Sequence, residues 1–391
     1  MGRRGARETT MDMMTQLLSA ISAEVEARRL PGAVIAVTAD GSLIDLQAVG
    51  KLDPYGARPM PDDAIFRIYS MTKVFVALAA LRMMAEDKLR LDDPVAEWLP
   101  YFAGLRVESD GALRPPKRPL LIEDLLRQTA GIGGGYHTSP NIKPYYEKAG
   151  IRKYEHRAGT YTLDDAVRNL AKQPLAADPG TVWEYGMALD VLGRILELAD
   201  GRPLDEIVDQ RVCRPLGLRD TGFSVRPADL HRVAQPSMDP PATPKDLVTH
   251  QERPAWLSAG SGGYSTAADF ATLLCAITPD RDGQLSIPAL GSNSRALFID
   301  QIGPLAGSGP DYLPGKGYGF SYGLHVPSTD PAWSALDPHA RTVGWLGRGA
   351  TCFLYHIPSG IGAVMMTQCY GRAVHYRDLV RSIVEQAAPW T

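Results

Sequence analysis

Apolar and polar residues follow two kinds of pattern along this chain of 391 residues. Amphipathic spacing predicts a first helix from about Met11 to Arg29, and two β-rich runs follow within residues 32–50. Asp40-Gly41 separates these runs, which is typical of a hairpin turn. Helical periodicity then marks residues 121–128, 163–172, 187–200 and 204–212, with long loops at 108–119 and 131–150. Strand patterns return at 317–326, 341–349, 351–357 and 362–368, before a last amphipathic helix from about Arg377 to Ala387.

This order of elements predicts an α/β fold. Strand edges need partners, so we expect the early hairpin and the late strands to form one mostly antiparallel sheet with the terminal helices packed on it. The sheet would belong to a discontinuous domain made of residues 11–80 and 255–391, and residues 81–254 would form an inserted, mainly helical domain. Long loops often line the site of a compact enzyme, so we expect an active site in the cleft between the two domains.

Charge and composition exclude several classes of partner. The net charge of −3 and the pI of about 6.3 come with scattered basic residues, which argues against a nucleic-acid or anionic-membrane partner. The longest apolar stretch, Val74 to Leu81, is too short to span a bilayer, and the N-terminus lacks the apolar core of a secretion signal. No cofactor or metal is expected, because the cysteines are widely spaced and no His/Cys cluster has metal-ligand spacing. We expect buried thiols and a cytoplasmic location; the cysteines are Cys213, Cys275, Cys352 and Cys369.

The segment RIYSMTK, residues 67–73, carries the candidate chemistry. Ser70 stands where a helix N-cap is expected, but the residue three positions later is Lys73, whereas a capping box has Glu or Gln there. A lysine offers only donors and a charge that opposes the helix dipole. Residues i and i+3 share one helix face, so the serine hydroxyl and the lysine amine would lie within reach of each other. Burial favours the uncharged amine, which can accept the serine proton, so the pair is a candidate nucleophile and base.

Two other motifs offer weaker alternatives. Residues 319–323 read G-x-S-x-G around Ser321, and His356 follows as a histidine partner would. A nucleophile elbow needs a helix after the serine, but the following residues are extended and rich in proline, so we expect Ser321 to be a strand residue. The glycines of residues 131–135 do not match a nucleotide-binding loop, and the eight histidines include no H-E-x-x-H motif.

Several segments, taken in order, resemble one known superfamily. They are SMTK (70–73), LIEDLLRQTAGI (121–132), PLAADPGTVWEYGMALDVLGRILE (174–197), RPLGLRDTGF (214–223) and GSGGYSTAADFATLL (260–274). Together they resemble the serine β-lactamases and penicillin-binding proteins, and within that superfamily the family VIII carboxylesterases and class C-type enzymes. The resemblance spans nearly the whole chain and implies a β-lactamase-like fold. It also implies that Tyr185 meets Ser70 and Lys73 in the cleft, where the tyrosine would deliver the proton to the leaving group. Whether Lys73 or Tyr185 is the base for acylation stays open.

The chain departs from the β-lactamase pattern at two places. Met187 stands where the family's Tyr-x-Asn motif has its asparagine, and Trp345-Leu346-Gly347 resembles the W-x-G variant of the family VIII esterases in place of Lys/His-Thr-Gly. By this alignment the backbone N–H groups of Ser70 and Arg348 would form the oxyanion hole. The residues expected to contact substrate are Tyr69, Met187, Trp345, Leu346 and Gly347.

The leading hypothesis is therefore a serine carboxylesterase that cleaves small acyl esters through a covalent acyl-enzyme. The alternatives are hydrolysis of a β-lactam or a D-amino peptide, or acyl transfer, on the same three residues. A catalytically silent binding protein on this fold is the third possibility, and the intact Ser70, Lys73 and Tyr185 argue against it. The partner would be a small-molecule ester; the sequence indicates neither the acyl chain nor the oligomeric state.

Overall fold

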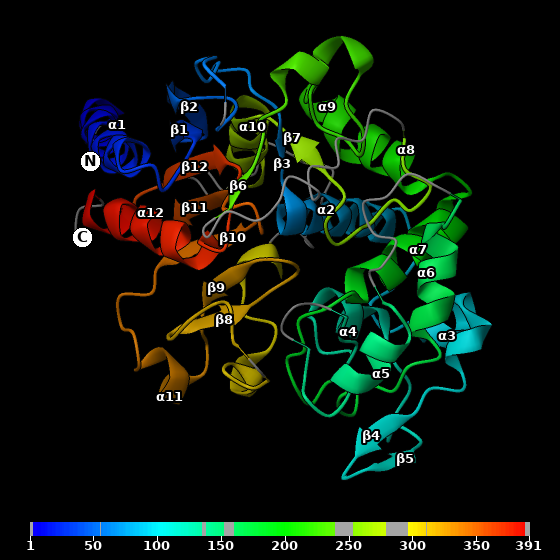
Figure 1. Cartoon of the computed structure of the whole chain (residues 1–391). Coiled ribbons are helices and arrows are strands. Elements are labelled where there is room, and N and C mark those ends of the chain that lie inside the picture. The colour runs from blue at the N-terminus through cyan, green and yellow to red at the C-terminus, as the bar shows by residue number, and fades with distance from the viewer. Residues whose placement is uncertain are drawn as a thin grey trace.

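A seven-stranded antiparallel sheet is the largest element of the computed structural model, which describes residues 3–54, 56–134, 138–151, 160–238, 253–278, 296–309 and 311–387 (Figure 1). Its strand order is β2-β1-β12-β11-β10-β9-β8. The bounds are Gly32–Ala39 for β1, Ser42–Gly50 for β2, Tyr318–Phe320 for β8, His325–Pro327 for β9, Thr342–Leu346 for β10, Cys352–His356 for β11 and Ile361–Thr367 for β12. β1 pairs with β12 from Ala33↔Thr367 to Ala39↔Ile361, which confirms the predicted union of the early hairpin with the late strands.

The predicted hairpin turn is also confirmed. Ala39 pairs with Ser42, and both Asp40 and Gly41 have positive φ angles, 49° and 72°. A two-residue turn with positive φ at both positions matches the right-handed twist of the strands that it joins.

Helices cover both faces of the sheet. α1 (Arg3–Glu26) and α12 (Ala373–Ala387) pack against each other and against the strands, and α10 (Ala267–Ile277) packs on β1, β2 and β12. All eight residues of β1 are buried, as expected for a strand with helices on both sides. Both terminal helices begin earlier than the apolar pattern predicts, and the N-terminal helix also ends earlier, at Glu26.

The middle of the chain is mainly helical. Its α-helices are α2 (Thr72–Ala85), α3 (Val95–Trp98), α4 (Ile122–Leu126), α5 (Lys143–Lys148), α6 (Leu163–Leu170), α7 (Ala188–Asp200), α8 (Leu204–Val208) and α9 (Arg214–Leu216); the short α11 (Pro331–Ser334) lies later. Two loop predictions were wrong in part, because the first loop contains the hairpin β4 (Val107–Ser109) and β5 (Ala112–Arg114), and the second contains α5. Two small two-stranded sheets lie outside the main sheet: β3 (Phe66–Arg67) pairs with β7 (Tyr264–Ser265), and β6 (Ser237–Met238) pairs with β13 (Cys369–Tyr370). The division into two domains stays a prediction.

The helix expected at 204–212 is interrupted. α8 ends at Val208 and continues as a π-helical turn, Asp209–Cys213, before α9. Pro215 has no N–H to donate to the carbonyl of Arg211, and the side chain of Arg82 donates to that carbonyl instead, at 2.6 Å.

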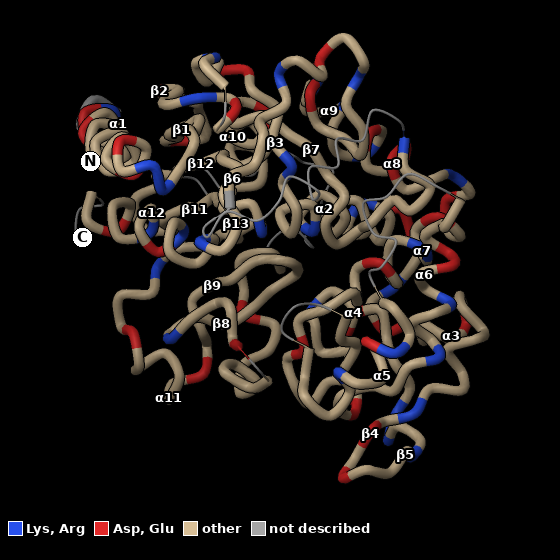
Figure 2. The backbone as a smooth tube through the Cα atoms, in the orientation of Figure 1, with Lys and Arg blue, Asp and Glu red and all other residues tan. Residues whose placement is uncertain are grey.

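The helix α2 lies where the sheet meets the helical region, and it contacts α7 and α8 (Figure 1). Nearly all its side chains are buried, so its N-terminal end is fixed by packing from several directions. Figure 2 shows basic and acidic residues interspersed along the described chain.

Candidate active site

Ser70 lies in a 3₁₀ turn, Tyr69–Met71, that leads directly into α2. The expectation that Ser70 caps the helix was wrong: the N-cap position is Met71, and no side chain caps either element. Tyr69 has φ +44°, a left-handed conformation that is unfavourable for a bulky side chain by about 1–3 kcal/mol. Such strain is retained where the surroundings over-determine the backbone, and here the buried hydroxyl of Tyr69 contacts the hydroxyl of Tyr370.

Lys73 is in the first turn of α2 and is only 3 % exposed. Its Nζ donates to the carbonyl oxygen of Gly260 at 2.8 Å and lies 4.7 Å from the ring centroid of Tyr185. Gly260 is closely surrounded, because a Cβ there would lie 3.4 Å from Lys73 Nζ and 2.9 Å from Asp190 Oδ2. The glycine therefore lets the lysine amine and the buried carboxylate of Asp190 approach the same backbone.

Tyr185 stands just before α7 and is also buried. The indole Nε1–H of Trp345 donates to its hydroxyl oxygen at 3.1 Å, and Trp183 stacks on its ring with centroids 5.5 Å apart. Trp345 thus has a polar contact as well as a packing role, which the sequence did not indicate. The hydroxyl oxygen of Tyr185 thus has a hydrogen-bond donor from strand β10, and the ring of Tyr185 faces the amine of Lys73.

The end of β10 lies against the segment before Ser70. A Cβ on Gly347 would be 2.5 Å from the carbonyl oxygen of Ile68, so only glycine allows this approach without a shift of backbone. The turn that begins at Gly347 brings Arg348 to the same cavity as Ser70. The guanidinium of Arg348 lies 5.3 Å from the ring centroid of Tyr370.

One cavity of about 530 Å³ brings all nine predicted site residues together. They are Tyr69, Ser70, Lys73, Tyr185, Met187, Trp345, Leu346, Gly347 and Arg348. The sequence missed the other lining residues, which are Gly186, Asp190, Gly260, Ser261, Leu313, Tyr370, Gly371, Arg372, Ala373, Val374 and His375. Asp190 could have been identified from the sequence, because it is an acidic residue within the apolar run that forms α7.

The rival nucleophile Ser321 lies elsewhere. It is fully buried, and its Oγ donates to the carbonyl oxygen of Leu297 at 2.7 Å. His356 Nδ1 lies 2.8 Å from Ser359 Oγ, and His356 lines a separate cavity. Neither Ser321 nor His356 lines the cavity that contains Ser70.

The sequence also led to expectations about metal binding, cysteines and membrane spans. Among the described residues, no three His, Cys, Asp or Glu side chains gather where they could bind a metal ion. The four cysteines are buried thiols, as expected. No helix within the described ranges has the length and apolarity to cross a membrane.

Comparison with known proteins identifies the family of this chain. The model of the family described as Beta-lactamase matches residues 17–388. The chain belongs to the beta-lactamase family. This family member is 34% identical to Esterase EstB of Burkholderia gladioli over 360 residues, which cover 87% of this chain and 86% of the relative. It is a serine hydrolase of that family, and its fold is the predicted one.

Solved structures of similar proteins share the whole fold. The structure of EstCE1, described as a hydrolase with promiscuous acyltransferase activity, superposes with a TM-score of 0.78 and 27% identity, covering 97% of this chain and 99% of that one. Simvastatin synthase from Aspergillus terreus superposes with a TM-score of 0.76 over 95% of this chain and 98% of that one. At 20% identity, the second match supports the fold alone.

Proposed function

We propose that this serine hydrolase is a carboxylesterase that cleaves small acyl esters through a covalent acyl-enzyme on Ser70. The observation that carries the proposal is the meeting of Ser70, Lys73 and Tyr185 at one cavity, with the indole of Trp345 hydrogen-bonded to the tyrosine oxygen. The similarity to an esterase, EstB, and to a hydrolase, EstCE1, supports the same chemistry.

The reaction would proceed in two balanced halves. In acylation, Ser70 Oγ forms a bond to the ester carbonyl carbon while its proton passes to the Lys73–Tyr185 pair. The backbone N–H groups of Ser70 and Arg348 would donate to the oxyanion. The tyrosine hydroxyl would return the proton to the departing alkoxide, which leaves as the alcohol. In deacylation a water oxygen forms a bond to the acyl carbon while a water proton passes to the same pair; the bond to Ser70 Oγ then breaks, the proton returns to Oγ, and the acid is released.

The apolar residues that line the cavity favour a neutral acyl group. Met187, Leu313 and Leu346 line it, and an uncompensated carboxylate against such side chains costs several kcal/mol of desolvation. Two cations, Arg348 and Arg372, line the same cavity. A carboxylate on a substrate would therefore find its partners at these arginines and not along the apolar wall.

The test compares p-nitrophenyl butyrate with a chromogenic cephalosporin on one enzyme preparation. We expect kcat/KM for the ester to be greater by about a thousandfold or more, which is about 4 kcal/mol of transition-state preference. Arg372→Gln should lower the residual cephalosporin activity more than the ester activity. Comparable efficiencies on the two substrates would overturn the esterase assignment and favour the β-lactam or D-amino-peptide alternative.

Acyl transfer is a second candidate, favoured by the similarity to EstCE1 and its described acyltransferase activity. An alcohol would replace water in the second half-reaction. Product analysis of p-nitrophenyl butyrate turnover with added 1-butanol separates the two outcomes. Butyl butyrate in excess of the free acid would show that transfer dominates, and butyric acid alone would show that hydrolysis does.

A further inference from the structure

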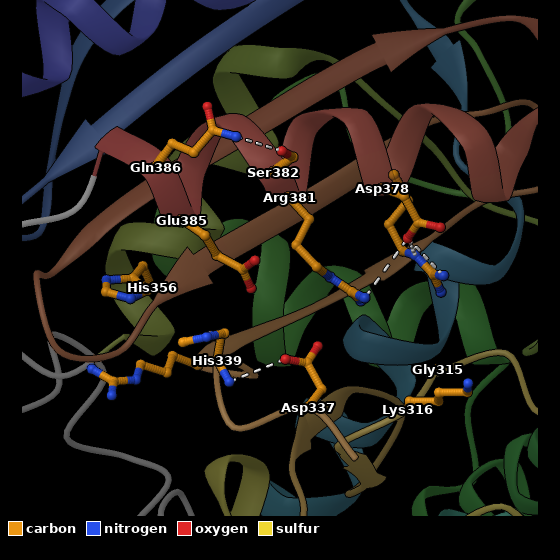
Figure 3. Close-up of a pocket in the computed structure, with 12 residues that line it drawn as sticks. Gly315, Lys316, Asp337, His339, His356, Asp378, Arg381, Ser382, Glu385 and Gln386 are labelled. Carbon is orange, nitrogen blue, oxygen red and sulfur yellow. Dashed lines mark hydrogen bonds and ion pairs between the residues drawn. The ribbon is translucent and has the colours of Figure 1, made fainter. Parts of the chain in front are cut away.

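A second cavity, of about 630 Å³, lies apart from the active site along the helix α12 (Figure 3). Its walls come from α12, the end of β11, residues 337–341 before β10, and the Gly315-Lys316 turn. None of its lining residues lines the active-site cavity. Its volume lies within the range of sites that hold small organic ligands, about 300–1,000 Å³.

Positive charge predominates in this second cavity. Four permanent cations line it, Lys316, Arg341, Arg377 and Arg381, against three carboxylates. All three carboxylates already have donors inside the protein. Asp378 Oδ1 accepts from Arg377 Nε at 2.9 Å, Asp337 Oδ1 accepts the backbone N–H of His339 at 3.0 Å, and Glu385 Oε1 accepts from the Tyr318 hydroxyl at 2.9 Å.

Arg381 has donor capacity left over. Its guanidinium lies 4.2 Å from the ring centroid of Tyr318, and its Nη1 lies 3.7 Å from Asp378 Oδ1. Its Nε is buried and finds no acceptor among the described residues. Figure 3 shows this side chain reaching from α12 into the space between the helix and the Lys316–Asp337 side. Arg377 is one turn away on the same helix face, and Asp378 Oδ1 lies 2.9 Å from Arg377 Nη2, so the two arginines share one carboxylate.

Burial, and after it the nearby positive charge, lowers the pKa of three groups in and beside this cavity. Burial and the nearby charge of Arg381 lower the pKa of Arg377, and burial followed by Arg381 and Arg377 lowers the pKa of His325 well below its usual range. Burial and Arg341 lower the pKa of His356 to about 4. These histidines are thus uncharged near neutrality, and the positive charge of the cavity comes from the four cations.

We propose that this second cavity binds a small organic oxyanion, a phosphate- or carboxylate-bearing molecule, at the cations that line it, which include Lys316, Arg341 and Arg381. Guanidinium groups present paired N–H donors that match the oxygens of phosphate and carboxylate. The apolar part of the ligand would occupy the rest of the volume. An oxyanion here supplies a second negative charge to Arg377 and Arg381, which otherwise share the carboxylate of Asp378.

The test is calorimetric titration of the full chain with inorganic pyrophosphate and, separately, with citrate, at about 0.15 M ionic strength to screen nonspecific attraction. We expect saturable one-to-one binding of at least one probe, and the stronger probe identifies phosphate or carboxylate as the preferred group. Lys316→Gln and Arg341→Gln should each weaken binding by about tenfold, the effect of losing one charge-assisted contact. Lys172→Gln removes the same charge from a distant exposed position and should leave the dissociation constant unchanged.

Three results would overturn the proposal. They are no saturable binding of either probe, binding that is unaffected by Lys316→Gln and Arg341→Gln, and binding that Arg348→Gln abolishes, which would place the anion in the active-site cavity. Lys316 is exposed and Arg341 is partly exposed, so we expect both variants to fold. Circular dichroism and the melting temperature of each variant check this.

Discussion

The hydrogen bond from Trp345 to Tyr185 gives the sharpest test of how the site works. Trp345→Phe removes the indole donor but keeps an aromatic ring among its neighbours, Tyr185, Phe320 and His325, whose ring centroids lie 5.4, 5.1 and 6.2 Å away. If the tyrosine oxygen gains negative charge in the transition state, the donor at 3.1 Å stabilises it by about 1.5–3 kcal/mol. The expected loss in kcat is then about tenfold to a hundredfold.

The assay is steady-state hydrolysis of p-nitrophenyl butyrate, combined with a double-mutant cycle. Tyr185→Phe alone should reduce kcat strongly, and adding Trp345→Phe to it should have little further effect, because the acceptor is already gone. Trp333→Phe is the matched control: its Nε1–H donates to the Tyr318 carbonyl at 2.8 Å, and it lies outside the active-site cavity. Its kcat should stay within about twofold of the original.

Thermal melting separates chemistry from packing, since replacing a buried indole by a smaller ring costs about 1–2 kcal/mol of stability. The reasoning is refuted if the fold reduction in kcat of the double variant equals the product of the reductions in the Trp345→Phe and Tyr185→Phe single variants. In that case the indole would act on the site by a route other than the tyrosine hydroxyl.

Three further predictions concern the nucleophile, the lysine and the acid stability of the fold. A fluorophosphonate probe should label a single serine, Ser70, and Ser70→Ala should abolish labelling; peptide mapping of the adduct to Ser321 would reject this assignment. Lys73→Met should lower kcat by about a hundredfold or more without unfolding the protein, because proton transfer is lost, and near-normal turnover in the folded variant would exclude the lysine from that role. The pKa of His356 falls from its ordinary 6.5 to about 4, so the stability that depends on its neutral form is complete above pH 6.5 and is lost as the pH falls toward 4. His356→Gln should therefore flatten the melting temperature over that window, and a pH dependence identical to that of the original protein would contradict the assignment.

The sequence was most informative where local rules act alone. The Asp40-Gly41 turn and the strand patterns predicted the sheet, and the spacing of Ser70 and Lys73 marked the start of α2. The same dipeptide at Asp110-Gly111, again with positive φ at both residues, forms the β4–β5 hairpin that was taken for a loop. The strands there are only three residues long, too short to show a pattern.

Other features depend on packing between distant segments, which no local pattern contains. Arg372 reaches the active-site cavity because the start of α12 lies beside it, and that placement follows from how α12 packs on β10, β11 and β12. The hydrogen bond between Trp345 and Tyr185 joins residues from two distant parts of the chain. The prediction that Ser70 caps α2 was wrong because the chain enters α2 through a 3₁₀ turn, which contains the strained Tyr69.

The pairing of β1 with β12 also sets the order in which the protein can become active during synthesis. β1 leaves the ribosome early, but its partner is almost the last strand to be made. Until then β1 has only β2 beside it, and its other edge, with its apolar side chains, is open to wrong partners. The site around Ser70 is likewise incomplete until β10 and the turn at Gly347 have been synthesised. A nascent or C-terminally truncated chain that stops before Ile361 should therefore contain the nucleophile yet lack hydrolase activity, and it should depend on chaperones to remain unaggregated.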